Sequence, residues 1–459
     1  MTDHIARGVA LLALVGTAIL LLAAPADPAG RAIAEAAALT LFTVTFWATG
    51  VLPNHVTALG FFLIAILFTA VPAAVVFAGF ESTAFWLVFG GLAIGIAVQR
   101  TGLGGRLARA MVGVFGTAYW RVIAGLVAGG IALAFVMPST MGRIVMLAPV
   151  VAAMADRLGL EPGGRGRAGM VLAMCLGTFM PAAGILPSNL ANMVLMGAAE
   201  TVHGVTITYF QYLALHFPIL GLLKAVFIVI LTVRLFGEET RPVAEEAAAR
   251  QPLSRDEKVL AAILAVALAF WATDFLHHIS PAWIALAAGF VCLLPGVRLV
   301  PPKAFEEGMH VGPLVYVGGI LGIAAVVAES GLGTILAQWV IDAGALAPDA
   351  PVRNYASLFG LSTLVGMAAT IGGVPAIMTP LAGEMARAAE LPLVTVLMTQ
   401  VLGFSTIVLP YQLPPLVVGM QLGGVSMREG ARLTLPLAVV TLLLVLPANY
   451  FWWRALGYL

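Results

Sequence analysis

Apolar runs of membrane-spanning length recur along this sequence, and they constrain the fold more than any other feature. A helix needs about 20 apolar residues to cross the hydrocarbon core of a bilayer. Only 10% of the residues are charged, against about 25% in soluble domains. The sequence therefore predicts an all-α polytopic membrane protein. The candidate runs lie near 8–24, 32–50, 56–79, 84–99, 206–236, 258–276, 281–297, 312–328 and 431–453.

Two segments, a charged stretch and the first apolar run, show how the chain is divided into parts. Residues 237–257 carry many charges, which predicts a solvated cytoplasmic linker that divides the chain nearly in two. The first apolar run follows Arg7 and precedes Pro25, a pattern shared by secretory signal peptides and first transmembrane helices. We expect an uncleaved first transmembrane helix within residues 1–31, because many further spans follow it.

The two halves of the chain resemble each other in three places. The Gly-rich run that begins at Gly90 has a counterpart at Gly318, and the stretch from Gly142 has one at Gly373. The stretch Pro187 to Gly197 is matched by Pro414 to Gly424. Chance similarity between Gly-rich membrane segments is the alternative, but the matches keep their order and an offset of about 230 residues. An internal duplication is therefore predicted.

The charges that flank two long, broken apolar regions indicate opposite orientations. Arg100, Arg106 and Arg121 precede the region 122–156, and Arg157 and Arg165 follow it, which predicts a cytoplasmic location for its ends. The matching region 354–390 is flanked mainly by acidic residues, which predicts a periplasmic location. Each region can enter the membrane and return as a re-entrant hairpin. Equivalent hairpins that open to opposite sides are typical of inverted-topology repeats.

These observations predict about 11 transmembrane helices in two inverted repeats, each with a re-entrant hairpin and a broken helix. The first repeat would cover 32–236, with a hairpin at about 122–156 and a broken helix at about 168–198. The second would cover 258–459, with a hairpin at about 354–390 and a broken helix at about 392–424.

Four breaks in the apolar regions carry the polar chemistry. Irregular backbone at membrane depth is tolerated only where it is buried in protein or lines a wet cavity. Half-helices that begin there point free N–H groups and positive dipole ends inward, which suits an anion. Ser and Thr at helix contacts can also serve close packing alone, but paired breaks with polar clusters favour a binding site. The breaks lie at 138–143, 181–192, 370–375 and 409–415.

The candidate ligands come from these breaks. Hydroxyl and amide groups are expected to bind the substrate, and unwound carbonyl oxygens could bind a coupling cation such as Na⁺. The candidate substrate-binding residues are Ser139, Thr140, Arg143, Ser188, Asn189, Thr370, Pro414 and Pro415. The candidate ion-binding residues are Ser139, Gly142, Gly184, Asn189, Thr370 and Gly373.

Two basic residues interrupt apolar segments. Arg143 lies in an apolar stretch, where a charge costs at least about 2.5–3.5 kcal/mol on insertion scales. Arg143 could contact the anion, or supply the positive charge that Na⁺ supplies elsewhere. Alternatively, it could extend to the interface or pair with a buried acid. Lys224 lies within an apolar run, and we expect it to extend its amine to the interface.

The layout resembles the divalent anion/sodium symporter family within the wider ion transporter superfamily. The similarity covers nearly the whole chain and rests on two pairs of segments. Ser139-Thr140-Met141 and Thr370-Ile371-Gly372 take the place of the Ser-Asn-Thr hairpin tips, each followed by a proline at the same distance. Pro187-Ser188-Asn189 and Pro414-Pro415-Leu416 take the place of the Pro-Pro-Asn turns in the broken helices.

The resemblance implies several properties of the whole protein. They are elevator-type alternating access, a homodimer, Na⁺ coupling and transport of di- or tricarboxylates, with sulfate or other oxyanions as further candidates. The sequence departs from the family pattern at three positions. Both hairpin tips lack Asn, and Leu416 stands where relatives have Asn, so the second cation site lacks a ligand that the family uses.

We therefore expect a secondary active transporter of a small organic anion in a bacterial inner membrane. Na⁺ or H⁺ is the candidate coupling ion, and no cofactor is expected. A cation/proton antiporter is the alternative, although none of the breaks contains Asp or Glu. An enzyme is not expected, because no HExxH motif occurs, and the absence of a GxxxxGK[ST] loop counts against a primary pump. The net charge of +1 gives no reason to expect nucleic acid as a partner.

Overall fold

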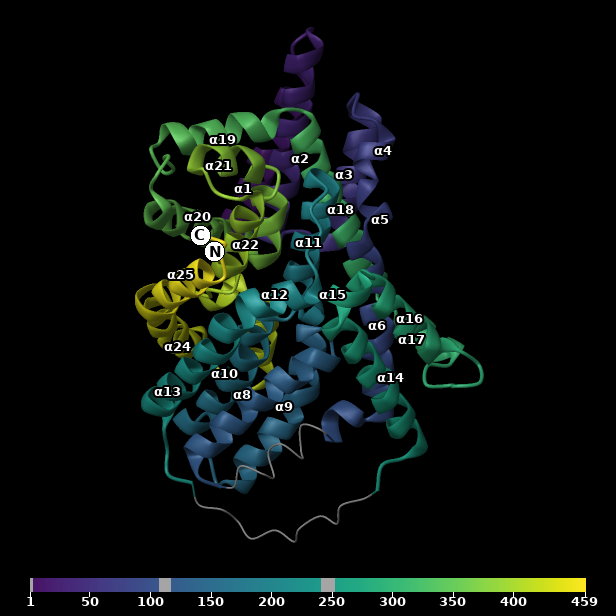
Figure 1. Cartoon of the computed structure of the whole chain (residues 1–459), viewed down its shortest axis with the longest axis vertical. Coiled ribbons are helices and arrows are strands. Elements are labelled where there is room, and N and C mark those ends of the chain that lie inside the picture. The colour runs from purple at the N-terminus through teal and green to yellow at the C-terminus, as the bar shows by residue number, and fades with distance from the viewer. Residues whose placement is uncertain (1–2, 107–116, 241–251) are drawn as a thin grey trace.

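The computed structural model describes residues 3–106, 117–240 and 252–459, and the described residues form helices and connecting loops (Figure 1). The helices of the first half are α1 Asp3–Leu22, α2 Pro28–Thr49, α3 Asn54–Phe68, α4 Ala73–Val76, α5 Ala78–Glu81, α6 Thr83–Thr101, α8 Tyr119–Val136, α9 Thr140–Arg157, α10 Arg165–Phe179, α11 Leu190–His203, α12 Tyr209–His216 and α13 Lys224–Phe236. Those of the second half are α14 Arg255–Ala272, α15 Asp274–His277, α16 Pro281–Leu293, α17 Pro302–Gly308, α18 Val311–Glu329, α19 Leu332–Asp342, α20 Pro351–Met378, α21 Ala382–Ala389, α22 Leu393–Phe404, α23 Pro414–Leu422, α24 Met427–Val440 and α25 Leu446–Ala455.

Many of these helices are long and apolar enough to cross a membrane. Nine in the described part of the chain meet that requirement, or ten if the bent pair α21 and α22 counts as one span. Two of the spans continue through π-helical turns, at η3 Phe217–Leu223 between α12 and α13 and at η5 Thr441–Val445 between α24 and α25. The predicted all-α polytopic membrane fold is confirmed.

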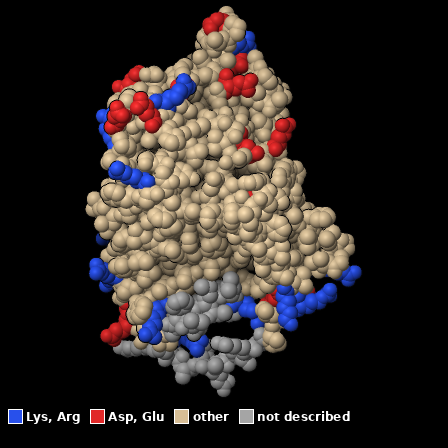
Figure 2. Space-filling view, in the orientation of Figure 1, with Lys and Arg blue, Asp and Glu red and all other residues tan. Residues whose placement is uncertain are grey.

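Charged side chains separate toward the two ends of the molecule. Figure 2 shows many Lys and Arg side chains at the lower end, whereas most of the Asp and Glu side chains visible in this view lie near the upper end. The wide band between them is almost free of charge in the same view. By the positive-inside rule, we expect the lower end to be cytoplasmic. Part of the predicted linker, residues 241–251, lies outside the described residues.

The first hairpin consists of α8 and α9, which lie at the lower end of the molecule (Figure 1). The chain leaves the helical conformation only at Met137–Ser139, because Pro138 cannot donate to a preceding turn. Ser139 then caps α9, and its hydroxyl accepts a hydrogen bond from the amide of Gly142 at 3.1 Å. The break is shorter than the predicted 138–143, because residues 140–143 are already helical.

The second hairpin lies within α20, which is interrupted at Thr370 (φ 61°, ψ 172°). A Cβ on Gly366 would lie 3.4 Å from a methyl group of Val374. Eight residues of straight helix would separate these positions by about 12 Å, so the chain folds back at Thr370. The neighbouring α19 and α21 lie at the upper end, opposite the first hairpin (Figure 1). The break is therefore one residue long rather than the predicted 370–375.

Each broken helix is interrupted by extended and 3₁₀ backbone. Between α10 and α11 the chain forms the short turns η1 Pro181–Gly184 and η2 Leu186–Ser188. Between α22 and α23 it forms η4 Pro410–Gln412. The side-chain amide of Asn192 donates to the carbonyls of Ala183 and Ile185. It thereby supports the irregular backbone of the break, in addition to the bond that the Ile185 carbonyl accepts from the amide of Ser188.

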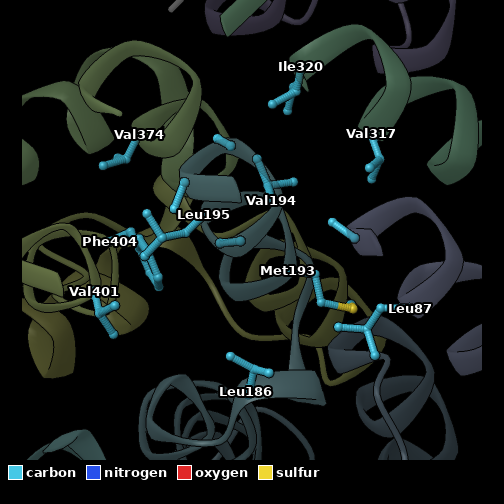
Figure 3. Close-up of a cluster of buried hydrophobic side chains, with 14 of the residues drawn as sticks. Leu87, Leu186, Met193, Val194, Leu195, Val317, Ile320, Val374, Val401 and Phe404 are labelled. Atoms are coloured by element: carbon cyan, nitrogen blue, oxygen red, sulfur yellow. The ribbon is translucent and has the colours of Figure 1, made fainter. Parts of the chain in front are cut away.

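Helix α11 lies at the centre of the larger buried cluster. In Figure 3, Met193, Val194 and Leu195 of α11 lie between Val317 and Ile320 on one side and Val401 and Phe404 on the other. Val317 and Ile320 belong to α18, and Val401 and Phe404 belong to α22, so a half-helix of the first broken helix packs against two helices of the second half of the chain. This packing holds the two broken helices side by side in the middle of the molecule.

Candidate functional site

The four breaks meet at one cavity of about 300 Å³ in the middle of the molecule. Residues 138–141 and 370–372 reach it from the two hairpin tips, and 189–191 and 413–415 reach it from the two broken helices. Helices α3, α6 and α18 complete the wall. Segments separated by hundreds of residues therefore form a single site, in the place where inverted repeats are known to place substrate sites.

Several half-helices begin at this cavity. Helix α9 begins at Thr140, α11 at Leu190 and α23 at Pro414. All three of these residues line the cavity. The N-terminus of a helix presents free N–H groups and the positive end of the helix dipole. Pro414 and Pro415 have no N–H group, so α23 contributes its dipole but fewer donors. The combined field favours a negative ligand.

Six of the eight predicted substrate-binding residues line the cavity. They are Ser139, Thr140, Asn189, Thr370, Pro414 and Pro415. Asn189 caps α11 by accepting from the amide of Asn192 at 3.0 Å, and its own amide nitrogen donates to the hydroxyl of Ser188 at 3.2 Å. Ser188 is fully buried and does not line the cavity; its hydroxyl donates to the carbonyl of Ala182.

Arg143 is also absent from the cavity wall. Its side chain is 0% exposed, and its guanidinium donates to the carbonyls of Met137, Ser188 (2.9 Å) and Thr178 (3.0 Å). A further hydrogen bond reaches the hydroxyl of Thr140 at 3.2 Å. The side chain neither extends to the interface nor pairs with an acid among the described residues. Instead it ties the first hairpin tip to both edges of the first break.

The three predicted ion-binding glycines lie behind the cavity wall. Gly142 donates its amide to Ser139. A Cβ on Gly184 would lie 2.9 Å from the Cα of Phe217, and one on Gly373 would lie 2.8 Å from the side chain of Ala369. Close packing against neighbouring segments is therefore a sufficient reason for glycine at the last two positions.

Unbroken helices contribute residues to the site that were not predicted from the sequence. Asn54 of α3 and Tyr316 of α18 line the cavity, and Trp47 packs edge-on against Tyr316 at 5.2 Å between ring centroids. A polar residue within an apolar helix is the only sequence signal that points to Tyr316. Asn54 follows a Pro at the start of a helix and looks like an ordinary helix terminus.

The side chain of Lys224 does not lie where the sequence predicted it. The predicted extension of its amine to the interface is wrong, because the side chain is 0% exposed. Its Nζ donates to the carbonyl of Ser405 at 3.0 Å and contacts the Ser405 hydroxyl at 3.3 Å. Ser405 caps the C-terminus of α22, so Lys224 lies at the edge of the second break.

Relatives of the chain were found by sequence and by structure. A membrane protein of Cupriavidus necator is 26% identical over 394 residues, which cover 83% of this chain and 76% of the relative. An uncharacterized transporter of Haemophilus influenzae is 24% identical over 271 residues, which cover 57% of this chain and 56% of the relative. The crystal structure of the Alcanivorax borkumensis YdaH transporter has a similar fold, with a TM-score of 0.59 and 19% sequence identity over 83% of this chain and 87% of that one.

A match between the chain and a family model shows the family to which the chain belongs. The family model described as the sodium:sulfate symporter transmembrane region matches residues 3–459, which is nearly the entire chain. The predicted resemblance to the divalent anion/sodium symporters is thereby confirmed. The chain belongs to the sodium:sulfate symporter family of membrane transporters.

Proposed function

We propose that this protein is a secondary active transporter of small organic anions of the di- or tricarboxylate class. The observation that carries the proposal is the convergence of four backbone breaks on one cavity. Hydroxyl groups, an amide and helix N-termini surround the cavity, and no charged side chain lines it among the described residues. Neutral donors and dipoles bind a carboxylate without the desolvation cost of an extra buried cation on the wall.

The size and lining of the cavity fit this substrate class. A volume of about 300 Å³ is at the lower end of ligand pockets, which suits a molecule of a few carbon atoms. A cation/proton antiporter would need a titratable carboxylate at the site, and none lines the cavity in the described part of the chain. Inorganic oxyanions such as sulfate remain the second candidate, because the same donors bind them.

The arrangement supports an elevator-type movement. The hairpin tips face unbroken helices at positions of close approach: a Cβ on Gly91 of α6 would lie 2.8 Å from the ring of Pro138. On the other side, a Cβ on Gly372 would lie 2.6 Å from the hydroxyl of Tyr316 in α18. We infer that the hairpins and broken helices slide as one unit along α6 and α18. Homodimer formation and a bacterial inner-membrane location belong to the same proposal and rest on the family.

Uptake into proteoliposomes tests this function. Radiolabelled succinate, citrate and sulfate would be offered separately, with and without gradients of Na⁺ and H⁺ and with unlabelled anion inside. We expect saturable uptake of a carboxylate, with sulfate as a weaker substrate. Failure to transport any of the three under every condition would contradict the proposal.

A cavity variant with a matched control connects uptake to this site. Thr140→Val removes a hydroxyl that lines the cavity, whereas Thr363→Val removes one that bonds only within α20, to the carbonyl of Phe359. A hydrogen bond to a charged group contributes about 1.5–3 kcal/mol, so Thr140→Val should raise KM about tenfold or more. Thr363→Val should leave KM unchanged; an equal rise in both variants would place the substrate elsewhere.

A further inference from the structure

The two broken helices differ in what they offer to the cavity. Asn189 of the first corresponds to Leu416 of the second when Pro187 is aligned with Pro414. Asn189 lines the cavity, whereas Leu416 is fully buried and does not line it. The second broken helix reaches the cavity with residues 413–415, a leucine and two prolines, which have no side-chain donor. This helix therefore offers an anion no hydrogen bond from a side chain.

The unbroken wall shows the opposite difference between the repeats. Val88 of α6 and Tyr316 of α18 both line the cavity. They are separated by the same interval as Gly90 and Gly318, where the duplicated Gly-rich runs begin. The wall is thus apolar in the repeat whose broken helix has an amide, and it carries a hydroxyl in the repeat whose broken helix has none. A donor that one element of the second repeat lacks is present on another.

The hydroxyl of Tyr316 is buried without a partner. Only 6% of the residue is exposed, and its hydroxyl has no hydrogen-bond partner within the described ranges 3–106, 117–240 and 252–459. Buried hydroxyls normally have one, because an unmet donor costs free energy. A Cβ on Gly372 would lie 2.6 Å from this hydroxyl, so the free donor lies at the second hairpin tip. A ligand in the cavity can supply the missing partner.

Neighbouring side chains hold the ring of Tyr316 in this position. Trp47 packs edge-on against it, with 5.2 Å between the ring centroids. The indole of Trp47 in turn donates to the carbonyl of Asn54 at 3.1 Å, and Asn54 itself lines the cavity. A donor whose ring is fixed by packing loses little freedom when it binds a ligand. The hydroxyl is therefore already placed for binding.

We propose that Tyr316 binds the second carboxylate of a dicarboxylate, so that the site selects anions with two charged ends. This inference rests on the proposed function and specifies its substrate. The first carboxylate lies at the N-termini of α9 and α11, beside Thr140 and Asn189 of the first repeat. The second lies at the other repeat, between Thr370 of the hairpin tip and the hydroxyl of Tyr316. An anion with a single charged group lacks the second contact.

The contact belongs to the wall and not to the sliding unit. Tyr316 is in α18, along which the hairpins and broken helices are proposed to move. The hydrogen bond therefore exists in the position that the structure shows and breaks when the unit slides. Such a contact stabilises the bound state and not the barrier to movement. Its loss should raise KM without lowering the maximal rate.

The first test is Tyr316→Phe, which removes the hydroxyl and keeps the ring. In proteoliposomes, KM for radiolabelled succinate should rise about tenfold or more, because a hydrogen bond to a charged group is lost. The maximal rate should not fall. Since the hydroxyl has no partner within the protein, the Tm in detergent without substrate should not fall either. Citrate replaces succinate if it is the better substrate.

Tyr355→Phe is the matched control. The hydroxyl of Tyr355 bonds within the protein, where it donates to the carbonyl of Leu446 and accepts from the side-chain amide of Asn449. Tyr355 does not line the cavity. The control should therefore lower the Tm and leave KM for succinate unchanged, which is the reverse of the result expected for Tyr316→Phe.

The second test uses butyrate, which has the length of succinate but only one carboxylate. Unlabelled butyrate and succinate compete separately with radiolabelled succinate, and the half-inhibitory concentration of each is measured. In the wild-type protein, butyrate should be the much weaker competitor. In Tyr316→Phe, the ratio of the two concentrations should fall about tenfold, because the variant no longer binds the second carboxylate. A residue that only shapes the cavity would weaken both anions alike and leave the ratio unchanged.

Specific outcomes would overturn the inference. An unchanged KM for succinate in Tyr316→Phe would do so, and so would an unchanged ratio between butyrate and succinate. The proposed function would stand in both cases, because the wild-type protein still transports succinate. Wild-type uptake of sulfate but of neither carboxylate would also overturn it, since sulfate has no second end. Absence of transport for every anion would defeat the proposed function itself, so the two failures are distinguishable.

Discussion

At the scale of single residues, Thr370 has a backbone conformation that residues with side chains rarely adopt. Its φ of 61° and ψ of 172° lie in a region populated almost only by glycine. A residue held there costs about 1–3 kcal/mol. The same residue lines the cavity at the tip of the second hairpin. We infer that the hydroxyl of Thr370 serves the substrate and that the fold tolerates the strain for this reason.

Thr370→Gly should therefore separate stability from transport. The substitution should relieve about 1–3 kcal/mol of backbone strain. The flexibility of glycine costs only about 0.5–1 kcal/mol. The Tm in detergent should therefore rise. Loss of the hydroxyl should lower succinate uptake. The control is Thr363→Gly in the straight part of α20, which should lower the Tm. A Thr370→Gly variant with a lower Tm than wild type would show that the conformation is not strained.

At the scale of elements, glycine sets how closely the helices of the unbroken wall approach each other. Helices α6 and α16 pack so tightly that a Cβ on Gly90 would lie 2.5 Å from the carbonyl carbon of Ala285. That atom belongs to backbone and cannot move as a flexible side chain can. Gly95, on the same helix, has open space around the position of a Cβ. The two glycines therefore differ in role although the sequence shows them in one Gly-rich run.

The pair Gly90→Ala and Gly95→Ala tests this difference within one helix. Gly90→Ala should lower stability by about 1–3 kcal/mol, because overpacking forces α6 and α16 apart. Gly95→Ala should be neutral or stabilising by up to about 1 kcal/mol, because alanine favours a helix. Thermal unfolding in detergent measures both. Equal Tm values for the two variants would mean that the close approach of α6 and α16 is not required.

At the scale of the whole molecule, the charge distribution predicts the orientation in the membrane. The lower end of Figure 2 carries many Lys and Arg side chains, and the hairpin α8–α9 opens toward that end. The second hairpin opens toward the other end. In an inverted pair, each hairpin opens to a different side of the membrane. Alternating access to a single cavity requires such an opening on each side.

Cysteine labelling in right-side-out vesicles tests the orientation. The native Cys175 and Cys292 are buried and should give little background. Asp349→Cys, at an exposed position between α19 and α20, should react with a membrane-impermeant maleimide in intact vesicles. Lys303→Cys, whose side chain is 85% exposed in α17, should react only after the vesicles are opened. The reverse pattern would invert the proposed topology.

The sequence by itself determined the features that arise locally along the chain. Apolar runs require a membrane, because no soluble fold could bury them. Pro138, Pro187 and Pro414 mark three of the breaks, since proline has no N–H group to donate to a preceding turn and therefore favours the boundary of a helix. The duplication and the opposite charge of the hairpin flanks followed from the order of residues alone. Together they predicted the inverted fold and most of the residues that line the cavity.

Only the tertiary structure decided where the long side chains point. Arg143 could have reached the substrate, the interface or an acid, and Lys224 was expected to reach the interface. The position of each side chain depends on carbonyls that lie far away in the sequence, at Ser188 and Ser405. The contribution of Tyr316 was likewise decided by the packing of α18 against the hairpin tip. A buried charge takes the position in which distant backbone oxygens satisfy it, and no local pattern specifies which oxygens the fold will bring there.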